Sequence, residues 1–226
     1  MRRRCLHLVL LLALATTAAL FAGCFPRDAG PSLQHFDDLA PAVGESAPSF
    51  ALETLDGERV YLDDLLGDGP VVLQFGSHSC PVYRYRRHWM DGLWEEYGER
   101  VRFVMVYTIE AHPVGSKSPY AEDEWDPWIN RMVGVRVEQP PTYAARRERA
   151  ATSKHALGIP ITYLVDAMDD GVWQAYGAAS SPAFVLDRNG TVVESQVWID
   201  PDAIRAALDR LLANDCGPRE GSPPGS

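Results

Sequence analysis

Apolar residues recur along the chain with two different spacings, which divide it into predicted strands and helices. Residues 70–75 (PVVLQF) and 101–107 (VRFVMVY) are short apolar runs, typical of strands buried on both faces of a sheet. Residues 200–212 instead carry apolar side chains at helical spacing, after an aspartate that can cap the helix and a proline at its first position. The remaining patterns predict helices at 81–97 and 142–157, a strand at 161–165, and hairpins at 49–62 and 183–198 around the turns Asp56-Gly57 and Asn189-Gly190.

This order of elements predicts an α/β fold with a mixed central sheet, partly parallel and with antiparallel edges, flanked by helices. The pattern resembles the thioredoxin fold with an N-terminal β-hairpin extension. In that fold a proline in cis precedes a core strand and faces the reactive thiol. Residues 181–187 (SPAFVLD) resemble that segment, which implies that Pro182 is the cis-proline on the substrate side.

The beginning of the chain has the pattern of an export signal. Arginines at positions 2–4 precede an apolar stretch at 6–21, and small residues follow directly before Cys24. This ending resembles the lipobox of bacterial lipoproteins, which implies cleavage after Gly23 and a lipid on Cys24. A plain signal peptide cut nearby and an uncleaved anchor are the alternatives, and all three place the folded part outside the cytoplasm, in the periplasm or at the cell surface.

Four segments are therefore predicted: a signal peptide at 1–23, a lipid-anchored linker at 24–46, one domain at 47–214 and a disordered tail at 215–226. The 226-residue chain has 21 Lys+Arg and 31 Asp+Glu, a formal charge of −10. Removing the three arginines of the signal changes this charge to 18 − 31 = −13. A chain this acidic, without a basic stripe, is not expected to bind nucleic acid.

The cysteines exclude two classes of small domain. The four of them, Cys5, Cys24, Cys80 and Cys216, lie far apart, with no C-x-x-C pair and no His/Cys spacing of the zinc-site kind. A multi-disulfide framework and a zinc finger are thereby excluded. We predict no bound metal and no cofactor.

Cys80 has the sequence context of a reactive thiol. A predicted buried strand and a short polar loop, 76–79 (GSHS), lead into it, and a predicted helix follows. Unpaired N–H groups and the positive end of the dipole at a helix N-terminus favour an anion, so we expect a lowered pKa and a thiolate nucleophile. An inert buried cysteine is the alternative, which the polar loop disfavours. No dithiol motif surrounds Cys80, so its oxidised form needs Cys216 or an external thiol.

A second polar group follows the next predicted strand. Tyr107 ends that strand, and Glu110 and His112 come shortly after it. Because the carboxyl ends of parallel strands meet at one edge of a sheet, these side chains are expected near Cys80. A histidine exchanges protons near neutral pH and a carboxylate can orient it, so the pair predicts acid–base catalysis; a solvated surface pair is the alternative.

Together the two stretches resemble the iodothyronine deiodinase family, thioredoxin-fold selenoenzymes that remove iodine reductively from thyroid hormones. Residues 75–81 (FGSHSCP) match the family's strand-G-S-x-x-selenocysteine-P segment, with cysteine in place of selenium, and residues 107–112 (YTIEAH) match its Y-x-x-E-A-H segment. The resemblance implies site roles for five residues: Cys80 as nucleophile, Ser77 as a hydroxyl hydrogen-bonding the site, and Tyr107, Glu110 and His112 as a proton-handling network.

Two features of that family have no counterpart in this chain. Its second histidine is replaced within 139–142 (QPPT), and the arginine expected after the proline region is absent from 182–185 (PAFV). The Ser77-x-x-Cys80 spacing also resembles the S/T-x-x-C of peroxiredoxins, where a hydroxyl and an arginine hold a peroxide. The sequence assigns no arginine to that role.

The sequence thus predicts an exported thiol oxidoreductase in which Cys80 attacks a peroxide, a disulfide or a halogenated aromatic compound. Its expected partners are that small-molecule or thiol/disulfide substrate, an external thiol reductant and, through the lipid, a membrane. The alternative is a non-enzymatic thioredoxin-like lipoprotein that binds a partner, or copper through Cys80, His78 and His112.

Overall fold

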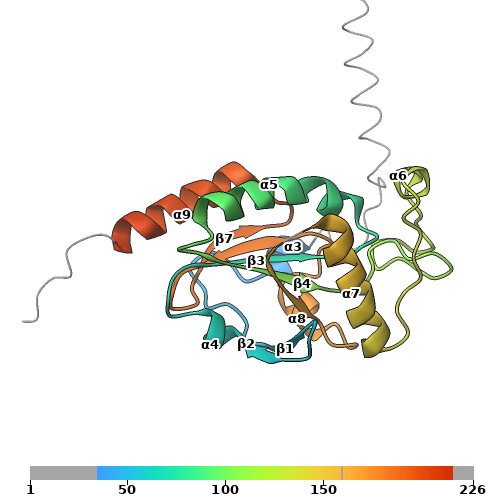
Figure 1. Cartoon of the computed structure of the whole chain (residues 1–226), viewed down its shortest axis with the longest axis horizontal. Helices are drawn as coiled ribbons and strands as arrows, with labels where there is room; N and C mark the ends of the chain where they lie inside the picture. Colours follow the sequence, from blue (N-terminus) through green and yellow to red (C-terminus); the bar gives the residue numbers. More distant parts are fainter. Residues whose placement is uncertain (1–34, 159, 216–226) are drawn as a thin grey trace, which may run out of the picture.

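A mixed β-sheet lies at the centre of the protein (Figure 1). The structure is a computed structural model that describes residues 35–158 and 160–215. The strands are β1 (Ala51–Thr54), β2 (Arg59–Tyr61), β3 (Val71–Gly76), β4 (Arg102–Tyr107), β5 (Thr162–Val165), β6 (Ala183–Leu186) and β7 (Val192–Gln196). The helices are α3 (Phe36–Leu39), α4 (Leu62–Leu65), α5 (Pro81–Tyr97), α6 (Trp128–Met132), α7 (Tyr143–Leu157), α8 (Gly171–Ala175) and α9 (Pro201–Asp215).

The seven strands follow the order β2-β1-β5-β4-β3-β6-β7. The neighbours β3–β4 and β4–β5 are parallel, and the other neighbouring pairs are antiparallel. The parallel strands β3 and β4 therefore end at the same edge of the sheet, and Figure 1 shows α6 beyond that edge. This topology confirms the predicted partly parallel sheet and brings the loops after β3 and β4 together.

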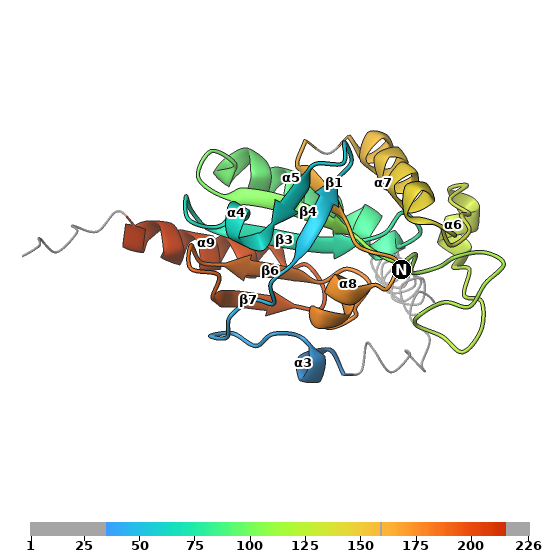
Figure 2. The ribbon, with the colours of Figure 1, turned by 90° about the horizontal axis from the view of Figure 1, so that it is seen from below.

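Both faces of the sheet are covered, which explains the continuous apolar runs in the sequence. Successive side chains of a strand point to opposite faces, so Val72 of β3 joins one core while Leu73 and Phe75 join the other. The first core contains residues of α5, α7 and α9. The second contains residues of α3 and α4, and Val172 of α8 packs against it; Figure 2 views the protein from the side of these three helices.

Two of the predicted helices, α7 and α9, begin at the residues that the sequence indicated. Helix α7 begins after Thr142, whose hydroxyl accepts a hydrogen bond from Ala145 N–H at 3.2 Å. Helix α9 begins with Pro201, and Asp200 Oδ1 accepts from the N–H of Asp202 at 3.0 Å. In the described part of the chain, no helix combines the length and the apolar surface that crossing a bilayer requires.

The predicted linker differs from the structure over the part that is described. Residues 35–46 pack against the sheet, and Phe36 is only 4% exposed, with its ring centroid 6.1 Å from that of Phe184. Gly177 has a φ of +87°, and a Cβ there would lie 2.7 Å from the Phe36 ring. The packed domain therefore begins no later than Phe36, because an apolar side chain is buried inside a segment whose composition suggested a tether. Of the predicted tail at 215–226, Asp215 is the last residue of α9, while residues 216–226 and Cys24 lie outside the described residues.

The expected cis peptide bond before Pro182 was wrong, since the described residues contain no cis peptide bond. An X–Pro bond is trans unless its surroundings favour cis. Here Ser181 bridges to Trp198, and the Pro182 carbonyl accepts from Phe75 N–H at 2.9 Å. These bonds hold the segment as a continuation of β6 with an ordinary trans backbone.

Candidate active site

Cys80 lies between the carboxyl end of β3 and the first turn of α5. It is the N-cap of the helix, Pro81 occupies the first helical position, and the Tyr83 N–H donates to Cys80 Sγ at 3.4 Å. The Ser180 side chain acts in the same direction, favouring the thiolate. The residue is 1% exposed and packs in one core cluster with Ala111 and Tyr120. The thiol therefore has the predicted position at a helix N-terminus, but it is closed off from solvent.

Burial changes the expected electrostatics of this thiol. Removal from water disfavours a thiolate and raises the pKa of Cys80, while the Tyr83 N–H, the Ser180 hydroxyl and the Arg84 charge act in the opposite direction. The expectation of a lowered pKa was therefore wrong. The helix N-terminus does stabilise the thiolate, but the loss of hydration on burial destabilises it more.

Glu110 and Tyr107 hold the backbone of the loop before Cys80. The His78 N–H donates to the Tyr107 hydroxyl oxygen at 3.0 Å, and the Ser79 N–H donates to Glu110 Oε2 at 2.8 Å. The Tyr107 hydroxyl in turn donates to Glu110 Oε1. Both acceptors are buried, and Glu110 is 0% exposed. The two predicted residues thus contact the loop rather than the sulfur.

The carbonyl groups of the same loop are held from the other side. Arg84 Nη1 donates to the His78 carbonyl at 2.5 Å, and Arg84 Nη2 donates to Asn130 Oδ1 at 2.6 Å. Asn130 Nδ2 donates to the Ser79 carbonyl at 2.8 Å. All four backbone polar groups of His78 and Ser79 are therefore bonded to side chains, which fixes the position from which Cys80 enters the helix.

Two serine hydroxyls join this loop to the segment after β4. Ser77 Oγ accepts from Ala111 N–H at 3.0 Å, and Ser79 Oγ accepts from His112 N–H at 2.9 Å. The Ser77 carbonyl accepts from Cys80 N–H at 3.2 Å. Ser77 therefore lies beside Cys80, as the resemblance implied, and its hydroxyl oxygen is occupied by a backbone donor.

His112 is held as a neutral imidazole. Its Nδ1 lies 3.1 Å from the Trp125 carbonyl, and the two rings meet edge to face with centroids 4.3 Å apart. Because a carbonyl can only accept, Nδ1 carries the hydrogen and the lone pair of the neutral ring is on Nε2. Burial lowers the pKa of His112 to about 4, partly opposed by the bond to Trp125 and reinforced by the Arg84 charge.

This lowered pKa predicts that acid destabilises the fold. In the unfolded chain His112 takes up a proton below about pH 6.5, whereas the folded protein resists protonation until about pH 4. The free energy of unfolding is therefore highest above pH 6.5 and decreases as the pH falls. The contribution of His112 to this decrease is about 2 kcal/mol at pH 5. Urea unfolding at pH 7 and pH 5 measures the loss. The variant His112→Gln should lose less stability between the two pH values than the unsubstituted protein. An equal loss in both proteins would contradict the assignment of His112 as a buried neutral imidazole.

Four residues near Cys80 were not singled out by sequence reasoning. Arg84 carried a usable signal, because it follows Cys80 by one helical turn. Ser180 had none, since a distant segment brings it to the site, and the sequence assigned no role to Asn130 or Gln139. Gln139 Oε1 accepts from Glu110 N–H at 2.9 Å, so this side chain, in the segment where the family's second histidine is missing, supports the Glu110 backbone.

Pro182 and Cys216 are the other two residues that the sequence predicted at the cysteine site. Pro182 contributes its carbonyl to the sheet, and Cys216 lies outside the described residues. Within residues 35–158 and 160–215, no group of three or more His, Cys, Asp or Glu side chains could hold a metal ion. The suggested copper ligands Cys80, His78 and His112 therefore do not form such a group.

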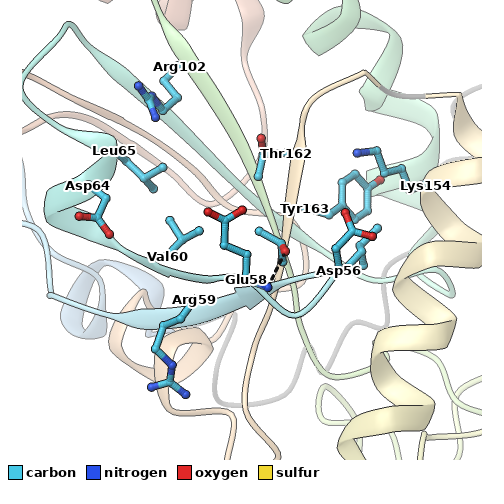
Figure 3. Close-up of a pocket in the computed structure, with 12 residues that line it drawn as sticks. Asp56, Glu58, Arg59, Val60, Asp64, Leu65, Arg102, Lys154, Thr162 and Tyr163 are labelled. Atoms are coloured by element: carbon cyan, nitrogen blue, oxygen red, sulfur yellow. Dashed lines mark hydrogen bonds between the residues drawn. The ribbon is translucent and has the colours of Figure 1, made fainter.

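A hollow of about 880 Å³ lies at the opposite end of the parallel strands (Figure 3). Its walls include Arg102 and Thr162, the first residues of β4 and β5, whereas Cys80 follows the last residue of β3. Charged side chains of both signs surround it, among them Glu58 and Lys154 (Figure 3). None of its lining residues is a cysteine or histidine, so this hollow is separate from the site around Cys80.

Comparison with solved structures supports the fold. An uncharacterized conserved protein from Geobacillus kaustophilus superposes with a TM-score of 0.55 at 23% identity, covering 80% of this chain and 87% of that one. A putative thiol:disulfide interchange protein DsbE from Chlorobium tepidum gives a TM-score of 0.51 at 22% identity, covering 79% of this chain and all of that one. The predicted thioredoxin-like fold is confirmed.

Comparison of sequences identifies the family. Thyroxine 5-deiodinase of Aquarana catesbeiana is 28% identical over 187 residues, 75% of this chain and 64% of the relative. Type I iodothyronine deiodinase of Xenopus laevis is 36% identical over 84 residues, 37% of this chain and 30% of the relative. The chain thus spans less than two thirds of the length of these relatives. The family model of iodothyronine deiodinase matches residues 32–198, and the chain belongs to the iodothyronine deiodinase family.

Proposed function

We propose that the protein is a thiol-dependent oxidoreductase whose nucleophile is Cys80. The observation that carries the proposal is the position of this cysteine, at the N-cap of α5 with the Tyr83 N–H donating to its sulfur. Groups that donate hydrogen bonds to sulfur favour the thiolate over the thiol. Family membership supports the same assignment, because the motif that carries the resemblance includes Cys80.

Reaction requires the site to open and the thiol to lose its proton. Cys80 is 1% exposed, so the packing around it has to open before a substrate can reach the sulfur. Opening admits water and relieves the burial that raises the pKa of Cys80. We assign proton transfer to His112, since its Nε2 is unprotonated and its backbone is bonded to Ser79, next to the nucleophile.

With a peroxide, the thiolate attacks one oxygen, the O–O bond breaks, and the departing alkoxide or hydroxide takes a proton. Cys80 becomes a sulfenic acid. A reductant thiol then attacks the sulfenic sulfur, water leaves, and a second thiol resolves the mixed disulfide and restores Cys80. With a disulfide substrate the first attack forms the mixed disulfide directly and releases one thiolate.

Reductive deiodination is the second candidate, and the family match favours it. The thiolate would bind the iodine of an iodinated aromatic ring as the carbon–iodine bond breaks, and a proton would replace iodine on the carbon. The resulting sulfenyl iodide would react with a thiol to give a disulfide and iodide. The relatives named above are called thyroxine and iodothyronine deiodinases, and we extend only the class of substrate to this chain.

Export and a lipid on Cys24 remain part of the proposal. They rest on the sequence pattern of the first residues, which lie outside the described part of the chain. In this location the reductant would be an external thiol or, within the chain, Cys216. Cleavage before Cys24 and the lipid would both be visible in the intact mass of the protein isolated from membranes.

Trapping the oxidised thiol tests the proposal. The full chain is treated with one equivalent of hydrogen peroxide and a 1,3-diketone that reacts with sulfenic acids, and the peptides are analysed by mass spectrometry. We expect the adduct on Cys80 and its absence from Cys80→Ser. Without the trap, a Cys80–Cys216 disulfide would appear as the loss of two hydrogen atoms that Cys216→Ser prevents. Adducts on other cysteines alone would refute Cys80 as the nucleophile.

A further inference from the structure

Arg84 joins three parts of the site through one side chain. It lies one turn along α5 from Cys80, and its backbone N–H donates to the Cys80 carbonyl at 3.2 Å. Its guanidinium donates to the carbonyl of His78 in the loop and to Asn130 on α6. The planar fork of an arginine can make two such bonds in fixed directions, which a lysine cannot.

Asn130 fixes the other end of this arrangement. Its side chain is fully buried, accepting from Arg84 through Oδ1 and donating through Nδ2 to the Ser79 carbonyl. The guanidinium therefore has one orientation, between α6 and the loop that leads into Cys80. A freely moving surface arginine would not constrain this loop.

Arg84 also lies among buried negative charge. Its interactions with Cys80 and with Glu110 favour the charged guanidinium, although burial lowers its pKa. Glu110 is 0% exposed, and it is placed by bonds to Ser79 and Tyr107. An ionised Cys80 would add a second anion to this interior, which is costly without a cation. Tyr120 is a further titratable group that interacts with this thiol.

We infer that Arg84 is a positioning residue of the reaction: held by Asn130, its guanidinium fixes the loop before Cys80 and compensates the negative charge of the Cys80 thiolate. This inference rests on the proposed role of Cys80 as nucleophile. It assigns to Arg84 no contact with the substrate.

The test measures thiolate formation directly, without a substrate. The ultraviolet absorbance of the thiolate is followed against pH in the full chain, and the same titration of Cys80→Ser is subtracted. In Arg84→Met we expect the midpoint of the Cys80 titration to move up by about one pH unit, because loss of a nearby opposite charge typically has an effect of this size. Arg84→Lys, which keeps the charge but not the fork, should recover most of the shift.

Arg86→Met is the matched control. Arg86 lies on the same helix, donates to the Ile199 carbonyl at 2.6 Å and lies over the Trp89 ring, 5.4 Å from its centroid. Its loss should leave the Cys80 midpoint unchanged. Arg84→Gln makes the same charge change and replaces Arg84→Met should the latter fail to fold.

An unchanged midpoint in the neutral Arg84 variants, or an equal shift in Arg86→Met, would overturn the inference. Because the titration needs no turnover, its outcome is separate from that of the proposed function. If no sulfenic acid adduct formed on Cys80 but the Arg84 variants still shifted its titration midpoint, only the proposed function would be refuted. If the adduct formed but the midpoint did not shift, only the inferred role of Arg84 would be refuted.

Discussion

Replacing Cys80 with serine is expected to abolish thiol-dependent reduction of hydrogen peroxide, lowering the rate at least about a thousandfold. A serine hydroxyl is un-ionised near neutral pH and cannot form the sulfenic acid or mixed disulfide on which turnover depends. The fold should be retained, because serine is a favoured N-cap and its oxygen can accept the Tyr83 N–H that Sγ accepts at 3.4 Å. Peroxide consumption with excess dithiol reductant measures the effect.

The variant Cys216→Ser separates the two thiols in the same assay. With an external dithiol present, this variant should keep most of the rate, since the reductant can replace a resolving thiol. A Cys80→Ser protein that retained more than about a tenth of the rate would exclude Cys80 as the nucleophile. Near-ultraviolet circular dichroism of each variant shows whether the tertiary packing is unchanged.

Replacing Glu110 with alanine is expected to lower the free energy of unfolding by about 2–5 kcal/mol, a large part of the stability of an ordinary domain. The change leaves two buried donors without their acceptor, the Ser79 N–H and the Tyr107 hydroxyl. It also removes the carboxylate that compensates Arg84. Urea unfolding at pH 7 gives the difference from the unsubstituted protein.

Two milder variants calibrate this loss. Glu110→Gln keeps one acceptor oxygen for the Ser79 N–H. Tyr107→Phe removes one donor to Glu110 and leaves a single N–H, that of His78, without its acceptor, so each variant should cost less than Glu110→Ala. If Glu110→Ala cost less than about 1 kcal/mol, the carboxylate would not support the loop as we describe. If unfolding were unaffected while reduction was lost, Glu110 would instead act directly in proton transfer.

The arrangement of the site followed from strand order more than from any single motif. Ser77 follows β3, and Glu110 and His112 follow β4; since these parallel strands are neighbours, their following loops had to meet. The contacts that these side chains make did not follow from the strand order. Spacing cannot show whether a carboxylate faces a sulfur or a backbone N–H, and Glu110 faces the N–H of Ser79.

Local patterns of apolar and polar residues were sufficient for the strands, the helices α5, α7 and α9 and the place of Cys80 at a strand–helix junction, because each depends on neighbours in the chain. They did not predict the short helices α3, α4, α6 and α8. The direction of its pKa shift, the bonds of Arg84 and Asn130, the trans bond at Pro182 and the burial of Phe36 arise only in the folded molecule. Each depends on segments that are distant in the chain. Burial and hydrogen bonding are set by whichever distant groups the packing brings together, and one sequence read locally does not contain that information.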